Sequence, residues 1–535
     1  MPIRHAAPLA AIALAGCAAT SETPMTHHDH ASVHDLARAP IYEAREADWR
    51  NGAIVYQVIV DRFAPPLDLD SKRHLYPAPK TLHAWDEQPV GGVEIPELGL
   101  WSHELAFWGG DLESLATKVG YIHDLGVDVL YLNPIHAAYT NHKYDAQDYN
   151  DVSPEYGDRE DVRELARTTE AMGMKLVLDG VFNHMGRTSP RFIEARDNPE
   201  SEFRDWYVFT DESEFGYRGW YNVKNLPEMN LENPDVRAHI WGDQDSVVRS
   251  YLRDGVDGWR LDVAFDIGPK WLTELTEAAH DEKPGSLVVG EIWNYPEEWF
   301  PAIDGIMNFH ARQIIFDVID GRISGAHAGR LLERMCADCD YEHLLKSWIM
   351  LDNHDTPRLA TYIPDASKRR MAQALQFTIP GAPNLYYGSE LGMTGGHDPE
   401  QRGLMAWHLV TDENEELAWT KTLLDLRNAS RALKVGDFRL LDTERLLAFS
   451  RRTDRVDELV VVVCNPTANA MEEVVPLRES KVMNHQRFVC ALTGVEAKNE
   501  PGLLRVTCPA RTVLVLRPEI GERGEHPYSS YKRVR

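Results

Sequence analysis

Long apolar segments are missing from most of this chain. Beyond its first 17 residues, no stretch of the 535-residue sequence is long and apolar enough to form a transmembrane helix. Positive charge is also scarce, with 56 Lys and Arg residues against 84 Asp and Glu residues, and the formal net charge is −28. This surplus of negative charge argues against nucleic acid, and against an anionic membrane surface, as the main partner.

Cysteine is rare as well, and the first of the six cysteines lies at the end of an apolar run near the N-terminus. Arg4 and the apolar run after it have the pattern of an export signal that is too short to span a membrane. The run ends in Leu14-Ala15-Gly16-Cys17, which resembles the bacterial lipoprotein box. We therefore predict a lipoprotein-type signal peptide over residues 1–17, with lipidation at Cys17, so that a lipid anchor is the only membrane contact. Ordinary cleavage near Ala18-Ala19 is the alternative.

The five other cysteines are odd in number, so at least one is a free thiol or bonds to another molecule. Cys336-Ala-Asp-Cys339 has C-x-x-C spacing, but without a second pair or nearby histidines it does not indicate zinc. In an exported protein this pair is compatible with a local disulfide, and equally with two thiols on a helix.

The chain divides into regions of different character. Residues 18–50 are polar and predict a flexible tether, although their four clustered histidines also allow a metal site. From residue 51 to about 433, eight short apolar strands alternate with amphipathic helices, which favours an α/β fold, a parallel (β/α)8 TIM barrel. Polar and aromatic residues at about 185–235, after the third strand, predict a small inserted lobe. The predicted strands cover residues 54–60, 127–132, 175–179, 259–263, 286–291, 304–309, 347–351 and 384–387.

The last quarter of the chain has a different pattern. Between residues 434 and 518, short apolar strands separated by turn residues predict an antiparallel β-sandwich domain. Residues 519–535 are expected to be a disordered tail. A second long excursion, between Arg62 and Trp108, interrupts the barrel near its start.

Charged and polar residues follow four of the predicted barrel strands. Active sites of such barrels gather where strands end, so these groups should converge. Arg260 and Asp262 lie at i and i+2 and should share a face, as an ion pair or as a nucleophile kept ionised by its arginine. Apolar residues before Glu291 favour its protonated form, as a general acid requires. The groups are Asp179, Asn183 and His184 after strand three, Arg260 and Asp262 at strand four, Glu291 and Trp293 at strand five, and His354 and Asp355 after strand seven.

The four stretches resemble the signature regions of the α-amylase superfamily of glycoside hydrolases, in the same order. The resemblance covers about residues 53–518 and implies a retaining reaction on α-glucans. It assigns the nucleophile to Asp262, the general acid to Glu291 and a third, stabilising carboxylate to Asp355. The remaining roles implied are substrate contacts at His184 and His354, support of the nucleophile by Arg260, and closure of the barrel end by Asp179.

A further stretch resembles the cyclomaltodextrinase, neopullulanase and maltogenic amylase group. In Asn141-His-Lys-Tyr-Asp145, the resemblance implies that Tyr144 stacks under the reacting sugar and that His142 assists it. Asp398-Pro-x-x-Arg402 also fits that group, and Arg402 is an expected substrate contact, as is Trp293 after strand five. The sequence leaves the oligomeric state open.

Calcium is the only metal that the resemblance suggests. The reaction needs no cofactor, but relatives can hold structural calcium in two sites: one at the lobe junction, where Asn183 would be a ligand, and another where Gly109 and Asp111 would join acidic residues after the first strand. Oxygen ligands suit this ion. The loop after the first strand lacks the asparagines that relatives carry there, so calcium remains a possibility rather than a requirement.

Together these observations predict an exported α-glucan hydrolase that cleaves α-1,4 bonds of maltooligosaccharides, cyclodextrins or starch fragments. A transglycosylase that uses the same site is one alternative. A glucan-binding lipoprotein without catalysis is another. The preferred substrate stays open.

Overall fold

The eight predicted barrel strands are confirmed in the computed structural model, which describes residues 33–520, 531 and 534. All neighbouring strands are parallel and the sheet closes on itself. The strands carry mostly Val, Leu, Ile and aromatic residues, because both of their faces are buried. They are β1 (Val55–Val58), β6 (Val129–Leu132), β9 (Lys175–Gly180), β10 (Gly258–Leu261), β11 (Leu287–Ile292), β12 (Gly305–Asn308), β13 (Trp348–Met350) and β14 (Ala382–Tyr386).

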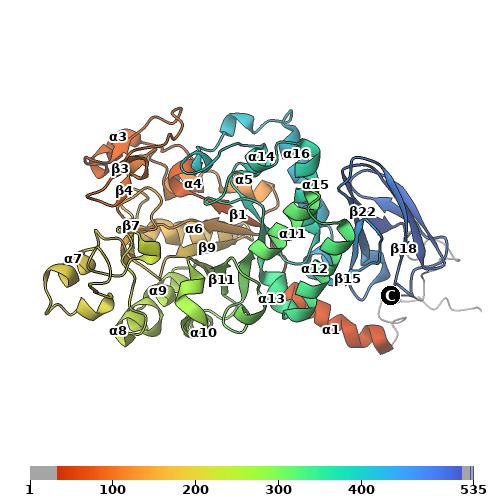
Figure 1. The fold of residues 1–535 in the computed structure, drawn as a ribbon, viewed down its shortest axis with the longest axis horizontal. Coiled ribbons are helices and arrows are strands. Elements are labelled where there is room, and N and C mark those ends of the chain that lie inside the picture. Colours follow the sequence, from red (N-terminus) through yellow and green to blue (C-terminus); the bar gives the residue numbers. More distant parts are fainter. Residues whose placement is uncertain (1–32, 521–530, 532–533, 535) are drawn as a thin grey trace, which may run out of the picture.

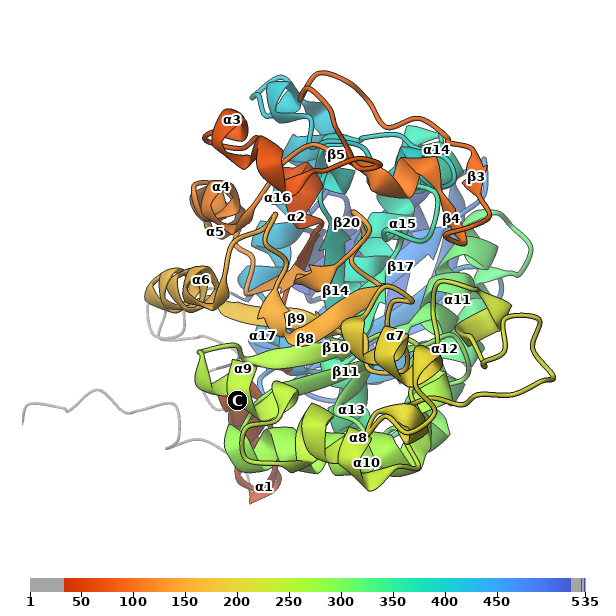
Figure 2. The same ribbon diagram turned by 90° about the vertical axis from the view of Figure 1, so that its left-hand side faces the viewer.

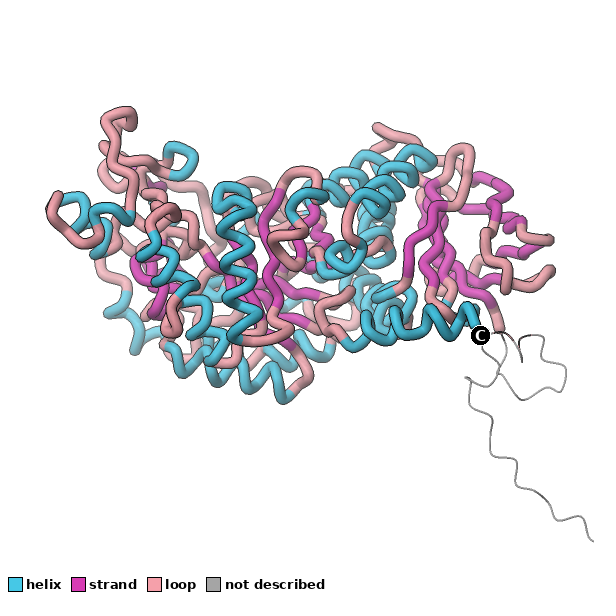
Figure 3. The backbone as a smooth tube through the Cα atoms, turned by 90° about the horizontal axis from the view of Figure 1, so that it is seen from below, coloured by secondary structure: helices cyan, strands magenta, loops and turns pink. Residues whose placement is uncertain are grey.

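Amphipathic helices surround the barrel, as Figure 3 shows in cyan. Local sequence fixes where they begin: the Asp158 side chain accepts hydrogen bonds from the first backbone N–H groups of α6. Their apolar faces pack on the outer face of the strands in one large core. The helices are α4 (Leu112–Ala116), α5 (Val119–Asp124), α6 (Arg159–Ala171), α9 (Val247–Arg253), α10 (Ala264–Glu282), α11 (Phe309–Ile319), α12 (Gly325–Asp338), α13 (Tyr341–Lys346), α15 (Ala366–Thr378), α16 (Glu415–Asn428) and α17 (Arg431–Val435).

Two insertions lie at one end of the barrel, on the left of Figure 1 and facing the viewer in Figure 2. The excursion between Arg62 and Trp108 carries α3 (Leu69–Lys72), the short strands β3 (Glu94–Ile95) and β4 (Leu100–Trp101), and the 3-10 turn η3 (Ser102–Leu105). The predicted lobe after β9 contains α7 (Pro190–Asp197), η5 (Trp220–Asn222) and isolated β-bridges rather than a regular sheet. Further short elements are α2 (Val60–Phe63), β2 (Thr81–Leu82), β5 (Ala106–Phe107), β7 (His136–Ala138), β8 (Ala146–Val152), α8 (Pro234–Arg237) and α14 (Leu359–Tyr362).

The predicted C-terminal β domain is confirmed as an antiparallel sheet domain at the opposite end of the molecule (Figure 1). Its strand order is β15-β16-β17-β22-β19-β20-β21-β18. Side chains from strands far apart in this order, such as Val461 and Val475, share one core. The strands are β15 (Asp437–Leu440), β16 (Leu447–Arg452), β17 (Val460–Asn465), β18 (Met471–Pro476), β19 (Arg487–Cys490), β20 (Glu496–Glu500), β21 (Leu503–Cys508) and β22 (Thr512–Pro518).

The flexible tether predicted for residues 18–50 is wrong over its second half. Val33–Ala47 form the helix α1, and the Arg45 side chain, 8% exposed, reaches Glu342 at 2.7 Å and Asp437 at 2.8 Å. Long charged residues made this segment look solvated, but their guanidinium groups bind carboxylates of two other parts of the chain. Residues 18–32, including three of the four clustered histidines, lie outside the described residues, as does Cys17.

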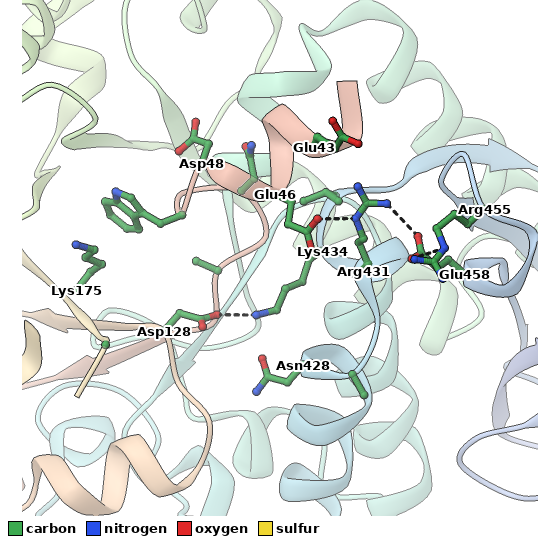
Figure 4. Close-up of a pocket in the computed structure, with 16 residues that line it drawn as sticks. Glu43, Glu46, Asp48, Asp128, Lys175, Asn428, Arg431, Lys434, Arg455 and Glu458 are labelled. Atoms are coloured by element: carbon green, nitrogen blue, oxygen red, sulfur yellow. Dashed lines mark hydrogen bonds and ion pairs between the residues drawn. The ribbon is translucent and has the colours of Figure 1, made fainter. Parts of the chain in front are cut away.

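A hollow of about 740 Å³ lies where α1, the barrel and the C-terminal domain meet (Figure 4). Ion pairs cross it: Arg431 contacts Glu46 at 2.8 Å, and Lys434 contacts Asp128 at 3.3 Å. Lys175, which also lines the hollow, pairs with Asp257. These ion pairs join the parts of the molecule that line the hollow, so the charges they involve are not free to bind a charged ligand.

Two further sequence predictions concern the C-terminal tail and the Cys336–Cys339 pair. Within the predicted tail, the Tyr531 side chain is 6% exposed and its hydroxyl donates to Gln486 at 2.8 Å, so this residue is docked. Cys336 and Cys339 are free thiols at the end of α12, as one of the two sequence interpretations predicts. Among the described residues, none of the helices combines the length and apolarity that crossing a membrane requires.

Candidate active site

The polar residues after four barrel strands converge at the end that carries both insertions. Arg260 of β10 is the register neighbour of Asp179 of β9, so the two side chains project from adjacent strands at the same level. Asp262 follows directly after β10, which ends two residues earlier than the sequence predicts. Glu291 belongs to β11, and Asp355 lies in the loop after β13.

Arg260 is the charge centre of this site. Its side chain is fully buried, and its Nη1 lies 2.9 Å from Asp179 Oδ1 and 2.9 Å from Asp262 Oδ1. Its Nη2 lies 2.8 Å from Glu291 Oε2. One guanidinium therefore holds three carboxyl groups in place, which a lysine with its single ammonium would not do.

The ionisation of Asp262 differs from the sequence-based interpretation. Burial raises the pKa of Asp262 well above its ordinary value, although Arg260 opposes this, and the nearby Glu291 and Asp179 raise it further. The sequence interpretation pairs Arg260 with Asp262 alone, whereas in the structure the Arg260 guanidinium contacts three carboxyl groups. Asp262 therefore retains a proton more readily than an isolated aspartate.

The surroundings of the Glu291 carboxyl are polar, which corrects the expectation of apolar neighbours. The apolar residues before Glu291 point into the barrel packing, but its Oε2 accepts from the backbone N–H of Val263 at 3.2 Å. Its Oε1 accepts from Trp293 Nε1 at 3.1 Å. These contacts fix the direction of the carboxyl group. The Trp293 ring itself is 53% exposed and stacks on Phe309, so it forms an accessible wall beside Glu291.

The Asp355 carboxylate contacts two neighbouring side chains, His354 and Arg402. Its Oδ2 lies 3.0 Å from His354 Nε2, and its Oδ1 accepts from Arg402 Nη2 at 3.2 Å. Burial alone would raise the pKa of Asp355, but His354 and Arg402 hold it well below its usual range. Asp355 is therefore ionised at neutral pH, and its side chain is 37% exposed toward the solvent.

Tyr144 lies beside His354 and Asp179 of this site. Its ring is parallel to the His354 ring, with centroids 5.3 Å apart. Its hydroxyl donates to Asp179 Oδ2 at 3.0 Å and accepts from Asn133 Nδ2 at 2.9 Å. The adjacent His142 accepts the Tyr144 backbone N–H at its Nδ1. The aromatic ring is thus fixed from three sides.

His184 completes the arrangement on the lobe side. Its Nε2 lies 3.9 Å from Asp262 Oδ2, and its ring stacks on Trp220 of η5 with centroids 5.6 Å apart. Burial lowers the pKa of His184 to about 3, so the imidazole is neutral at physiological pH. Trp220 also donates from Nε1 to Asp266 Oδ2 at 3.0 Å, which ties the lobe to α10.

The sequence interpretation missed several residues that shape the site. Asn133 directly follows β6, so the same search of strand ends would have found it. Gln57, whose Nε2 lies 2.9 Å from His354 Nδ1, sits inside β1 and shows no such signal. Glu104 and Trp220 come from the two insertions, whose irregular backbone cannot be placed from periodicity. Tertiary structure alone brings them to the barrel mouth.

Two of the predicted calcium ligands already bind a cation of the protein itself. Lys72 Nζ lies 2.7 Å from Asp111 Oδ2 and 3.2 Å from the carbonyl oxygen of Gly109. Asn183 lies elsewhere, and its carbonyl oxygen accepts the backbone N–H of Met229 at 2.9 Å. Within residues 33–520, no three His, Cys, Asp or Glu side chains gather as a metal cluster would require. Gly109 and Asp111 do not fit a calcium ion, because the Lys72 ammonium occupies the position between their two oxygens.

A closed barrel with two histidines, an arginine and four carboxyl groups at its strand ends is typical of a glycoside hydrolase of the α-amylase type. The catalytic-domain model of the alpha amylase family matches residues 57–431, and the chain belongs to this family. Its chemistry requires no cofactor.

Relatives and solved structures agree with this assignment. The chain is 32% identical to a cyclomaltodextrinase from a Bacillus species over 435 residues, which is 78% of this chain and 74% of that one. It is 30% identical to the intracellular maltogenic amylase of Bacillus subtilis strain 168, over 89% of this chain and 78% of that one. The cyclic α-maltosyl-(1→6)-maltose hydrolase of Arthrobacter globiformis superposes with a TM-score of 0.73 at 27% identity, covering 88% of this chain and 99% of that one. The protein is thus a hydrolase of the cyclomaltodextrinase and maltogenic amylase type.

Proposed function

We propose that this protein hydrolyses α-1,4-glucosidic bonds of maltooligosaccharides, cyclodextrins or starch fragments, with retention of the anomeric configuration. The observation that carries the proposal is the contact of one guanidinium, that of Arg260, with both Asp262 and Glu291. This contact keeps the two carboxyl groups close together. Retaining enzymes need a nucleophile and an acid about 5–5.5 Å apart, whereas inverting enzymes need a wider gap for water.

The reaction proceeds in two steps on these residues. Asp262 attacks the anomeric carbon while Glu291 protonates the leaving glycosidic oxygen, which gives a covalent glycosyl-enzyme intermediate. Glu291 then takes a proton from water, the water oxygen attacks the anomeric carbon, and Asp262 leaves as a carboxylate. The first step needs a proton on Glu291 and a charge on Asp262, and because the pKa of Asp262 is raised in the free protein, substrate binding must favour its ionised form.

The other residues bind and orient the reacting sugar. Tyr144 stacks beneath it, and the neutral His184 donates an N–H to a sugar hydroxyl near Asp262. The ionised Asp355 accepts hydroxyl protons and stabilises the positive charge of the oxocarbenium-like transition state. Arg402 holds Asp355, and Trp293 forms the wall next to Glu291. His354 completes the pocket beside Tyr144.

The test is product analysis with a cyclodextrin, soluble starch and pullulan side by side, with the anomer of the first product followed by proton NMR. We expect α-anomers from the parent protein and a fall in kcat of about 10²–10⁴-fold for Glu291→Gln, because the acid is lost. Glu164→Gln on the outside of α6 is the matched control and should keep parental turnover. Near-parental turnover of Glu291→Gln, or β-anomeric first products, contradicts the proposal. Products longer than the substrate point to transglycosylation, and binding without sugar release points to a binding protein.

We further propose that the protein is exported and anchored by lipid at Cys17, on the strength of the signal pattern in residues 1–17. The Bacillus subtilis relative is named intracellular, so location is a point on which the two proteins would differ. Labelled palmitate should enter the parent protein and not Cys17→Ser. A protein recovered unlabelled in the cytoplasmic fraction, with residues 1–17 still attached, contradicts export.

A further inference from the structure

The 3-10 turn η3, in the excursion before the barrel mouth, is clamped to the segment that carries His142 and Tyr144. The backbone carbonyl of Glu104 accepts the N–H of Asn141 at 2.8 Å. The Asn141 side chain in turn donates to the carbonyl oxygens of His103 and Ala106, each at 2.8 Å. The turn and the pocket wall are therefore one rigid unit.

Both ring nitrogens of His142 are engaged within this unit. Its Nδ1 accepts the backbone N–H of Tyr144 at 3.0 Å, so Nδ1 carries no proton. Its Nε2 lies 3.1 Å from Glu104 Oε1 and must therefore be the N–H that donates to this carboxylate. The contacts leave His142 a single tautomer, with the proton on Nε2.

We propose that Glu104 is a positioning residue for the reaction: by accepting the Nε2–H of His142, it fixes the tautomer of this imidazole and thereby the position of the Tyr144 ring under the reacting sugar. The inference rests on the proposed function, in which Tyr144 is the stacking platform. Without Glu104, the other tautomer places a proton on Nδ1, opposite the Tyr144 N–H. Two donors would then face each other and the segment would shift.

The same turn reaches the second wall of the pocket. His103 Nε2 lies 3.1 Å from Asp398 Oδ2, and Asp398 pairs with Arg402 at 3.4 Å. Arg402 donates to Asp355. Two successive residues of η3 therefore lead to Tyr144 on one side and to Asp355 on the other. An ion pair that only stabilised the surface would not link the Tyr144 side of the pocket to the Asp355 side.

The chemistry of Glu104 suits this role. Its side chain is 19% exposed, and its second carboxylate oxygen accepts the Trp101 N–H at the start of the turn. Although burial would raise it, the hydrogen bond from His142 holds the pKa of Glu104 below its usual value. Glu104 is thus an ionised acceptor, which is the form that stabilises the Nε2–H tautomer.

The test compares Glu104→Ala, Glu104→Gln and the matched control Glu87→Ala. Glu87 lies in the same excursion and pairs with His83 at 2.8 Å, outside the pocket. We expect kcat/KM to fall about 10- to 100-fold in Glu104→Ala, mainly through kcat, because a displaced platform weakens transition-state binding. Glu104→Gln should lose less, since its amide oxygen can still accept the Nε2–H. Glu87→Ala should keep parental kinetics, and added formate should partly restore Glu104→Ala.

Side-chain ¹⁵N NMR of histidine, with the His142 signal assigned by its loss in His142→Asn, reads the tautomer directly. The parent and Glu104→Gln should show the Nε2–H form, and Glu104→Ala a mixture. Parental kcat/KM in Glu104→Ala, or an unchanged tautomer there, overturns the inference. If Glu104→Ala does not fold, the tautomer and kinetics of Glu104→Gln decide. A parent that releases no sugar refutes the proposed function, whereas the tautomer still tests the role of Glu104.

Discussion

Replacing Arg260 by lysine should make the stability of the protein depend more steeply on pH. The guanidinium lies within 2.9 Å of three carboxyl groups, and an ammonium at this position can serve one of them well. Two charge-assisted contacts worth about 1.5–3 kcal/mol each are weakened, while protonation of a carboxyl group relieves part of the loss. We expect the free energy of unfolding to fall by about 3 kcal/mol near pH 8.

The sign of the pH dependence follows from Asp262. Its folded pKa is raised above the unfolded value of about 3.9, so the folded state binds the proton more tightly. Stability is then lost as pH rises from the unfolded pKa toward the folded one. Arg260→Lys raises the folded pKa further, so its destabilisation should be small at pH 5 and larger at pH 8.

The measurement is denaturant unfolding of the parent and Arg260→Lys at pH 5 and pH 8. Arg253→Lys, on the outer helix α9, is the control and should change stability little at either pH. Equal losses at both pH values, or a larger loss at pH 5, would refute the view that Arg260 offsets the buried charge of Asp262. Turnover by Arg260→Lys should also fall by about 10²–10³-fold, because Asp262, the proposed nucleophile, is less often ionised.

Two further predictions concern contacts outside the reaction centre. Because Lys72 already supplies positive charge at Asp111, dialysis against EDTA should leave the melting temperature and turnover unchanged, and a loss restored by calcium would contradict this. Arg45→Ala removes ion pairs to Asp437 and Glu342, both of which are partly exposed. The free energy of unfolding should therefore fall by about 1–2 kcal/mol, without a change in KM. Unaltered denaturant unfolding would show that α1 does not hold the two domains together.

The fold could be predicted because its signal is local and repeated. Eight short apolar strands alternating with amphipathic helices leave little besides a parallel barrel, and all eight strands appear where the sequence places them. The segment from Val33 to Ala47 could not be predicted in the same way. Its stability depends on carboxylates such as Asp437, which lies almost 400 residues further along the chain, and periodicity within a short window contains no information about that distance.

The residues of the candidate site likewise fall into those that could be predicted from local sequence and those that could not. Residues that follow regular strands, such as Asp179 and Glu291, could be found by their position alone. Residues on the insertions, such as Glu104 and Trp220, could not, because irregular loops acquire their place only by packing on the barrel. Contacts within the site were also partly hidden, since sequence spacing shows that Arg260 is near Asp262 but not that Glu291 shares it.

This sharing changes what the charges at the strand ends do. An arginine two residues from an aspartate on a strand suggests a private ion pair, in which the aspartate is simply kept ionised. In the folded barrel, Asp179 and Glu291 approach the same guanidinium, and each reduces the stabilisation left for Asp262. The free protein therefore favours the protonated form of Asp262, and the proposed reaction requires that substrate binding shift Asp262 to its ionised form.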